Sequence, residues 1–245
     1  MATSDVVILL IGLHGSGKST FTRAATGAEV KTSSNRHEVN ETTKTCQPYN
    51  TVYRGMKFTI IDTPGLADRK THEGNLAILD QIAHQLKNMG QARISGVIYF
   101  HSIQTMRLNA VHMANFRILR AICGEHFPHV AFVTSRWDRV RAEDIQSCET
   151  MNHHLELERR TLLPKGPRII KFLNDGKSHE RILDYFADQA DKTTGPATPT
   201  QLLFAEELKK YQFAERGTKA VRKTKAVKAI EKERKKVSKG SCCIL

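Results

Sequence analysis

The chain has 245 residues, of which 40% are hydrophobic, and a formal net charge of +13. This length allows one domain with a sizeable core plus appendages, and the hydrophobic content is ordinary for a soluble globular protein. Residues 217–241 hold ten basic and two acidic residues and so supply +8 of the net charge, which argues against a nucleic-acid-binding face spread over the fold.

The ends of the sequence and its cysteines favour a cytosolic environment. Residues 1–5 have neither the basic nor the apolar segment of a secretory signal, and Ala2 does not fit the myristoylation pattern. No apolar run approaches the roughly 20 residues that a membrane-spanning helix needs. The cysteines form no C-x-x-C pair, so we expect a reducing compartment. They are Cys46, Cys123, Cys148, Cys242 and Cys243.

A phosphate-binding motif follows the first apolar run. Residues 6–11 are continuously apolar, as expected for a strand buried on both faces, and residues 21–25 are typical of a helix start. Between them, residues 12–20 fit the pattern G-x-x-x-x-G-K-[ST]. In such a loop the backbone N–H groups and the positive end of the helix dipole face phosphate oxygens. The expected phosphate-binding residues are Gly12, Gly15, Ser16, Gly17, Lys18, Ser19 and Thr20.

Two side chains of this motif carry specific chemistry. Lys18 is expected to reach the β- and γ-phosphates of a nucleotide, and the Ser19 hydroxyl is expected to hold Mg²⁺. His14 occupies a loop position that faces the γ-phosphate, although it is equally consistent with a side chain that points to solvent. The motif therefore predicts a Mg²⁺-dependent nucleotide site.

A second nucleotide signature lies about 45 residues further on. The polar residues 26–53 predict a loop that runs into a strand near residues 47–53, and residues 58–61 predict a buried strand. That strand ends in a D-x-x-G motif, in which Asp62 is expected to reach Mg²⁺ through water and the Gly65 N–H to sense the γ-phosphate. Residues 66–74 form a candidate switch segment.

The rest of the domain alternates strands and helices. This order predicts an α/β fold with a mostly parallel sheet, helices on both faces, and a ligand at the carboxyl edge of the strands. The predicted helices are residues 75–87, 110–122, 143–163 and 179–187, and the predicted strands are residues 96–100, 130–134 and 168–172.

One of these strands leads into a guanine-recognition pattern. Guanine-specific proteins place an Asp in an [NT]-K-x-D sequence after a strand, where it accepts hydrogen bonds from N1–H and N2–H₂ of the base. Here Asp138 holds that position and Arg136 replaces the Lys, with its stem able to lie along the purine. The alternative is a solvated loop Asp beside a core Trp. A second base-contacting loop is expected at residues 174–179, with Ser178 and His179 as candidates.

Together these motifs resemble a known family, the septin-related P-loop GTPases of the avirulence-induced and immunity-associated (AIG) type, and most closely their fungal relatives. The resemblance covers residues 6–186 and rests on residues 12–20, 43–46, 62–65, 96–101, 123–124 and 134–138. It implies a GTP-binding G domain that takes GTP or GDP with Mg²⁺. It also implies that Thr43 is the switch threonine at Mg²⁺ and the γ-phosphate, with Thr42 and Thr45 as neighbouring alternatives.

Leu66 departs from the pattern of small Ras-like switches. Those proteins place a glutamine directly after D-x-x-G to orient the attacking water, which an aliphatic side chain cannot do. We therefore expect slow hydrolysis of GTP, with the missing group supplied by His14 or by a second subunit in a G-domain homodimer.

The C-terminal part predicts membrane attachment. We expect a G domain at residues 1–190, a linker at 191–199, a basic helical tail at 200–238 and a prenylation motif at 239–245. The last four residues fit C-a-a-X with Leu at the end, which favours geranylgeranylation of Cys242. One lipid chain binds membranes only marginally, and the neighbouring basic residues would supply the second signal.

The main functional hypothesis is a GTPase tethered to the cytosolic face of a membrane. Its nucleotide would order residues 42–45 and 66–74 and so expose a surface for a partner or a second copy. One alternative is a GTP-dependent assembly scaffold with negligible turnover. An ATP-using P-loop kinase or ATPase is a further alternative, which Asp138 disfavours.

Overall fold

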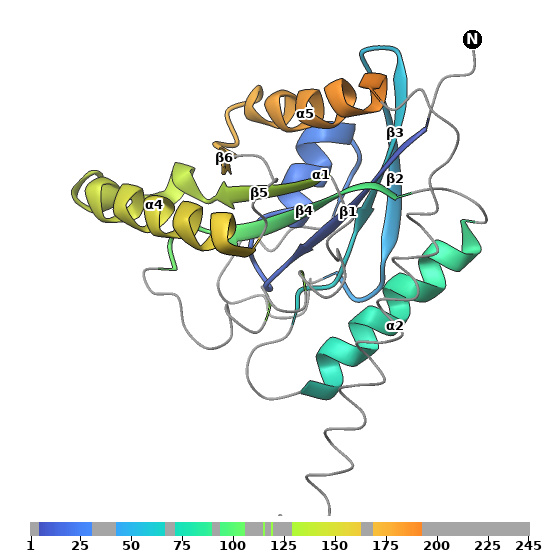
Figure 1. Ribbon diagram of the computed structural model, residues 1–245, viewed down its shortest axis with the longest axis horizontal. Coiled ribbons are helices and arrows are strands. Elements are labelled where there is room, and N and C mark those ends of the chain that lie inside the picture. Colours follow the sequence, from blue (N-terminus) through green and yellow to red (C-terminus); the bar gives the residue numbers. More distant parts are fainter. Residues whose placement is uncertain are drawn as a thin grey trace, which may run out of the picture.

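The computed structural model describes residues 5–30, 43–66, 72–89, 94–105, 115, 119, 129–162 and 169–192. Within them a six-stranded sheet has the order β2-β3-β1-β4-β5-β6 (Figure 1). The β2–β3 pair is antiparallel and the other neighbours are parallel, which confirms the predicted α/β class. The strands are β1 Val6–Gly12, β2 Gln47–Tyr53, β3 Met56–Asp62, β4 Ile94–Ser102, β5 Val130–Ser135 and β6 Ile170–Lys171, and the helices are α1 Lys18–Thr26, α2 His72–Asn88, α4 Ile145–Leu162 and α5 Ser178–Lys192.

Both faces of the sheet are covered by helices. All seven residues of β1 are buried, because alternate side chains of a strand point to opposite faces and both faces are packed. Val7, Leu9 and Ile11 belong to a core cluster shared with α2 and α4. Val6, Ile8 and Leu10 belong to a second cluster shared with α1 and α5, which lie beside each other in Figure 1. β1 thus forms the rigid centre from which the first loop emerges.

Several element boundaries differ from the predicted ones. α1 begins at Lys18, three residues before the expected start, because Gly17 adopts a left-handed conformation (φ 92°) and caps the helix directly. α2 begins at His72 rather than residue 75, and α5 continues to Lys192, two residues into the predicted linker. β6 has only two residues.

Some predicted segments lie outside the described residues. These are the tail from residue 193, most of the helix predicted at 110–122, and residues 67–71 of the second switch candidate. None of the helices that the structure describes is both long and apolar enough to span a membrane.

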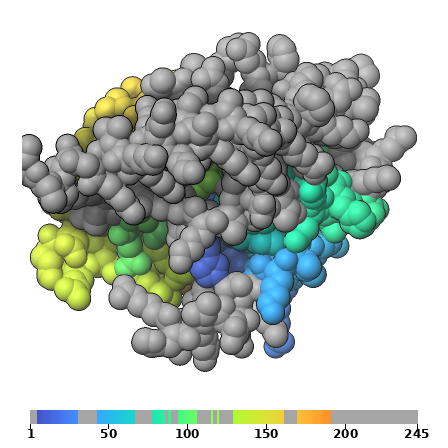
Figure 2. Space-filling view, turned by 90° about the horizontal axis from the view of Figure 1, so that it is seen from below, coloured from blue at the N-terminus to red at the C-terminus, as the bar shows by residue number. Residues whose placement is uncertain are grey.

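The loops that follow the parallel strands meet at one edge of the sheet. Figure 2 shows this edge from below, with the blue residues at the end of β1 between the light blue of the β2–β3 side and the yellow-green of the β5–α4 side. This arrangement brings together the segments that the sequence assigns to phosphate, Mg²⁺ and base.

Candidate functional site

The first loop curls tightly between β1 and α1. Gly15 and Gly17 have φ values of 70° and 92°, a left-handed conformation that glycine adopts without steric cost. A Cβ atom on Gly12 would collide with the carbonyl oxygen of Phe100 on β4. The loop therefore needs glycine at these positions to place its N–H groups at the start of α1, where anions bind.

Lys18 lies under this loop with only 5% of its surface exposed. Its Nζ donates hydrogen bonds to the carbonyl oxygens of Gly12 at 3.1 Å and of Leu13 at 3.0 Å. Burial lowers the pKa of Lys18 to about 8, and the charge of Asp62 partly opposes this shift. The ammonium is thus held in a poorly solvated place, where a phosphate would be a strong partner.

Three residues from separate segments meet at the start of α1. The Ser19 hydroxyl donates to Asp62 Oδ2 at 2.7 Å, and the Thr43 hydroxyl donates to the same oxygen at 3.2 Å. The hydroxyl oxygens of Ser19 and Thr43 are 3.1 Å apart. The residues that the sequence assigned to Mg²⁺ therefore form one cluster, although Ser19 and Asp62 are 43 positions apart.

The chemistry of this cluster fits a nucleotide-borne Mg²⁺. Among the described residues, no group of three or more His, Cys, Asp or Glu side chains could hold a metal alone. Mg²⁺ in phosphate sites needs only one or two carboxylates beside phosphate and water. Asp62 is fully buried, and its Oδ1 accepts no side-chain hydrogen bond from the described residues. Burial raises the pKa of Asp62, and the bonds from Ser19 and Thr43 and the charge of Lys18 oppose that rise.

The D-x-x-G segment is anchored to the first loop. The Thr63 hydroxyl donates to the Leu10 carbonyl oxygen at 2.6 Å, and the Leu66 N–H donates to the Gly12 carbonyl oxygen at 3.0 Å. A Cβ on Gly65 would lie 2.5 Å from the His14 Cα, so glycine is required for this close approach. The predicted phosphate-binding loop and the predicted γ-phosphate-sensing segment are therefore in direct backbone contact.

The side chains of Leu66 and His14 have opposite surroundings. Leu66 is 2% exposed and packs in the core cluster shared with α2. His14 is exposed at the turn of the first loop. The position where Ras-like proteins carry a water-orienting glutamine thus faces the interior here.

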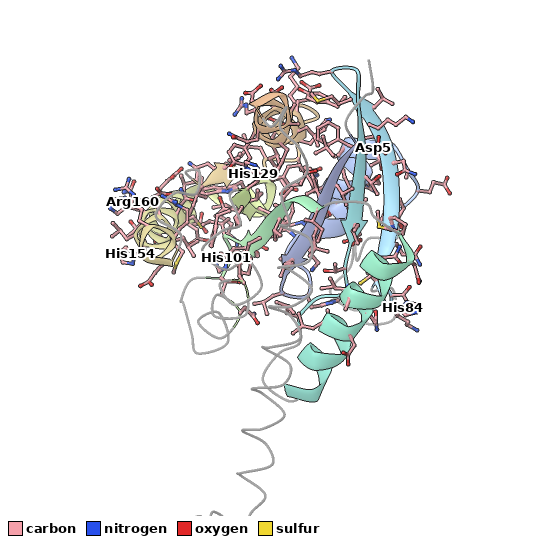
Figure 3. All side chains as sticks on the ribbon, turned by 45° about the vertical axis from the view of Figure 1, so that its right-hand side comes forward. Asp5, His84, His101, His129, His154 and Arg160 are labelled. Carbon is pink, nitrogen blue, oxygen red and sulfur yellow. The ribbon has the colours of Figure 1, made fainter. Side chains whose placement is uncertain are left out.

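The last residue of β5 and the loop that follows it are bonded to the first loop. The Ser135 hydroxyl donates to the Ser16 carbonyl oxygen at 2.6 Å, and Arg136 donates to the Gly15 carbonyl oxygen from Nε at 3.2 Å and from Nη2 at 3.1 Å. The carbonyl oxygen of His101, which Figure 3 labels at the lower end of β4, lies 3.3 Å from the Ser135 hydroxyl. Asp138 follows on an exposed turn. The segments predicted to bind the base and the phosphates are therefore joined by direct hydrogen bonds.

Comparison with known proteins supports the assignment of the fold. Residues 7–116 match the family model described as 50S ribosome-binding GTPase, which is less than half of the 245-residue chain. The fold is that of a P-loop GTPase G domain. No curated protein matches the sequence.

Solved structures at low identity share this G-domain fold. Two structures of Toc33 from Arabidopsis thaliana, a dimerization-deficient mutant and a complex with GDP and Mg²⁺, each have a TM-score of 0.59 at 15% identity, over 78% of this chain and 86% of theirs. A bacterial selenocysteine-specific elongation factor, EF-Sec, has a TM-score of 0.54 at 16% identity, over 78% of this chain and 29% of its own. The closer resemblance to septin-related and fungal proteins stays a prediction.

The second predicted base loop of the G domain is occupied by a cap of α5. Asp175 Oδ1 accepts hydrogen bonds from the N–H groups of Lys177 at 3.1 Å and Ser178 at 2.7 Å, which hold the pKa of Asp175 low, at about 2. The buried Ser178 hydroxyl accepts from the Leu173 N–H at 3.0 Å. Ser178 thus supports the turn, and its role as a base contact stays a prediction, as does that of His179.

Sequence reasoning did not single out Ser135 as a residue of the site. Its signal was present, because Ser135 stands at the first position of the [NT]-K-x-D pattern, directly before Arg136. Sequence reasoning also did not single out Asn152 of α4, which bonds the Thr134 hydroxyl at 3.0 Å. No local pattern marks Asn152, because the contact joins a helix to a strand end.

Proposed function

We propose that the G domain works as a slow, Mg²⁺-dependent GTPase that is tethered to the cytosolic face of a membrane. It would act as a nucleotide switch or through pairing of two G domains. The observation that carries the nucleotide part of this proposal is the meeting of Ser19, Thr43 and Asp62 beside the buried ammonium of Lys18. When bound, Mg²⁺ would neutralise negative charge on the β- and γ-phosphates.

The chain's own residues would divide the binding work. The N–H groups of the first loop and the start of α1 would bind the phosphates, with Lys18 as the charged partner. Asp138 would accept the N1–H and N2–H₂ hydrogens of guanine, and Arg136 would cover the purine while it stays bonded to Gly15. The presence of the γ-phosphate would order the chain preceding β2 through Thr43. It would order the chain following β3 through Gly65.

Slow turnover follows from the surroundings of Leu66. Its side chain is buried and apolar, and its N–H is bonded to Gly12, so neither of these groups could orient water. One candidate source of the water-orienting group is His14, whose side chain is exposed on the first loop. The other candidate source of the missing group is a second copy of the chain. The dimerization-deficient mutant of Toc33 supports this candidate, because it shows that a protein of this fold dimerizes and that a mutation can weaken the dimer. If turnover is absent altogether, the buried Leu66 favours a GTP-dependent assembly scaffold.

The first experiment measures GTP turnover per molecule as the protein concentration is raised, with ATP in parallel. We expect a slow rate with GTP that climbs with concentration, because pairing would complete the site. A flat, slow rate would indicate a switch that needs an external activator. Tight GTP binding with no turnover at any concentration would favour the scaffold. Equal use of ATP would contradict the guanine proposal.

Two variants serve as controls for the source of the water-orienting group. Leu66→Gln is expected to leave the slow rate unchanged, because a side chain at this position enters the core, and to lower stability by roughly 2–4 kcal/mol. His14→Ala separates the remaining sources: a lost rate assigns the role to His14, whereas an unchanged rate that still climbs with concentration assigns it to the second copy.

The membrane part of the proposal rests on Cys242 and the basic residues before it, which lie outside the described residues. Cys242→Ser is expected to release the protein from membranes, because the basic residues alone would not replace the buried lipid chain. Cell fractionation and the mass of the C-terminal peptide measure this. Cys243→Ser is the matched control and should stay attached. Attachment of the Cys242→Ser protein would contradict the lipid proposal.

A further inference from the structure

A polar chain connects the Asp138 loop to helix α4. The indole Nε1–H of Trp137 donates to the Thr134 hydroxyl oxygen at 3.0 Å, and the Thr134 hydroxyl donates to Asn152 Oδ1 on α4 at 3.0 Å. A hydroxyl group has one hydrogen and two lone pairs, so Thr134 can serve both neighbours at once. Thr134 is 1% exposed, which makes each of these bonds costly to lose.

A second contact holds the face of the same indole ring. Lys171 of β6 places its Nζ 4.3 Å from the centroid of the Trp137 ring. The same Nζ forms an ion pair with Glu149 of α4 at 2.5 Å. Trp137 is therefore fixed along its edge by Thr134 and across its face by Lys171, and both contacts lead to α4.

The orientation of Trp137 bears directly on Asp138. Residues Trp137–Arg139 form a 3₁₀ turn, closed by a hydrogen bond from the Arg139 N–H to the Arg136 carbonyl oxygen at 3.1 Å. With three residues per turn, successive side chains leave the backbone about 120° apart, so fixing the indole fixes the direction of the Cα–Cβ bond of Asp138. Asp138 is exposed, and the ion pairs of the described residues do not include it.

We propose that Thr134 and Asn152 are positioning residues for guanine recognition, acting through Trp137 on the Asp138 carboxylate. This inference rests on the proposed guanine site and adds its support on α4. A well-placed carboxylate accepts two hydrogen bonds from guanine but only one from hypoxanthine, which lacks the exocyclic amino group. Positioning is therefore read in the ratio of GDP affinity to IDP affinity.

The test compares GDP and IDP affinities of the full chain by titration calorimetry. Thr134→Val keeps the shape of the side chain and removes both hydrogen bonds. We expect its GDP affinity to fall by about ten-fold and its IDP affinity by less, so that the ratio shrinks. Thr134→Ser keeps the hydroxyl and should restore the wild-type ratio. Equal losses for both nucleotides, or an unchanged ratio, would show that Thr134 only stabilises the fold.

Asn152→Ala provides a second variant, at a partly exposed position of α4. It should shrink the same ratio in a protein whose thermal unfolding remains cooperative. If folded Asn152→Ala keeps the wild-type ratio of GDP affinity to IDP affinity, the proposed role of α4 is overturned. The proposed function fails in a different way, namely if the wild-type protein itself does not prefer GDP to IDP, and that result would overturn the positioning proposal with it.

Discussion

Replacing Asp138 by Asn is expected to lower the affinity for GDP by about 10²-fold or more and to raise the affinity for xanthosine diphosphate. The carboxylate can accept from both the N1–H and N2–H₂ groups of guanine. An amide at this position turns one acceptor into a donor, which opposes the guanine amino group and suits the 2-oxo group of xanthine. Competition binding with the three diphosphates of guanosine, xanthosine and adenosine measures the change.

The structure offers a matched control for this exchange. Asp175 is also an exposed loop carboxylate at the same edge of the sheet, but it accepts the N–H groups of Lys177 and Ser178. Asp175→Asn should lower stability slightly through weaker capping and leave base preference unchanged. Preserved guanine preference in Asp138→Asn would mean that Asp138 is a solvated loop residue.

Lys18→Met is expected to reduce nucleotide affinity by at least about 10²-fold without lowering the stability of the empty protein at pH 7. Most substitutions of a buried residue that abolish function also lower the stability of the fold. Here burial lowers the pKa of Lys18 to about 8, so the folded protein holds the charged ammonium at a cost. Removing that charge offsets the loss of its bonds to Gly12 and Leu13.

The pH dependence of stability checks this explanation. The pKa of Lys18 is about 8 in the folded protein and near its ordinary value of 10.5 in the unfolded chain. Between these values the unfolded chain binds more protons, so wild-type stability rises with pH relative to Lys18→Met. The stability of Lys18→Met relative to the wild type should therefore be highest below pH 8 and fall toward pH 10, as measured by denaturant unfolding. A constant difference across this range would contradict a charged, desolvated Lys18.

The sequence by itself determined the fold class and the order in which the predicted phosphate, Mg²⁺ and base segments occur along the chain. An all-apolar run such as residues 6–11 can only be a doubly buried strand or helix, and the glycine-rich motif that follows decides between them. β2 was predicted with its observed bounds, because turn residues mark its far end. These signals are local, since they depend on backbone conformation and on periodicity along a few residues.

Only the tertiary structure decided which side chains meet and which way they point. Ser19 and Asp62 form a hydrogen bond although they are 43 positions apart. The spacing of the two motifs predicted a shared site but not this contact. Whether Leu66 faces the nucleotide or the core depends on the bond of its N–H to Gly12 and on the packing of α2, neither of which a local pattern contains. The hydrogen bond between Thr134 and Asn152 is also decided by the tertiary structure, because it depends on how helix α4 packs against the end of β5.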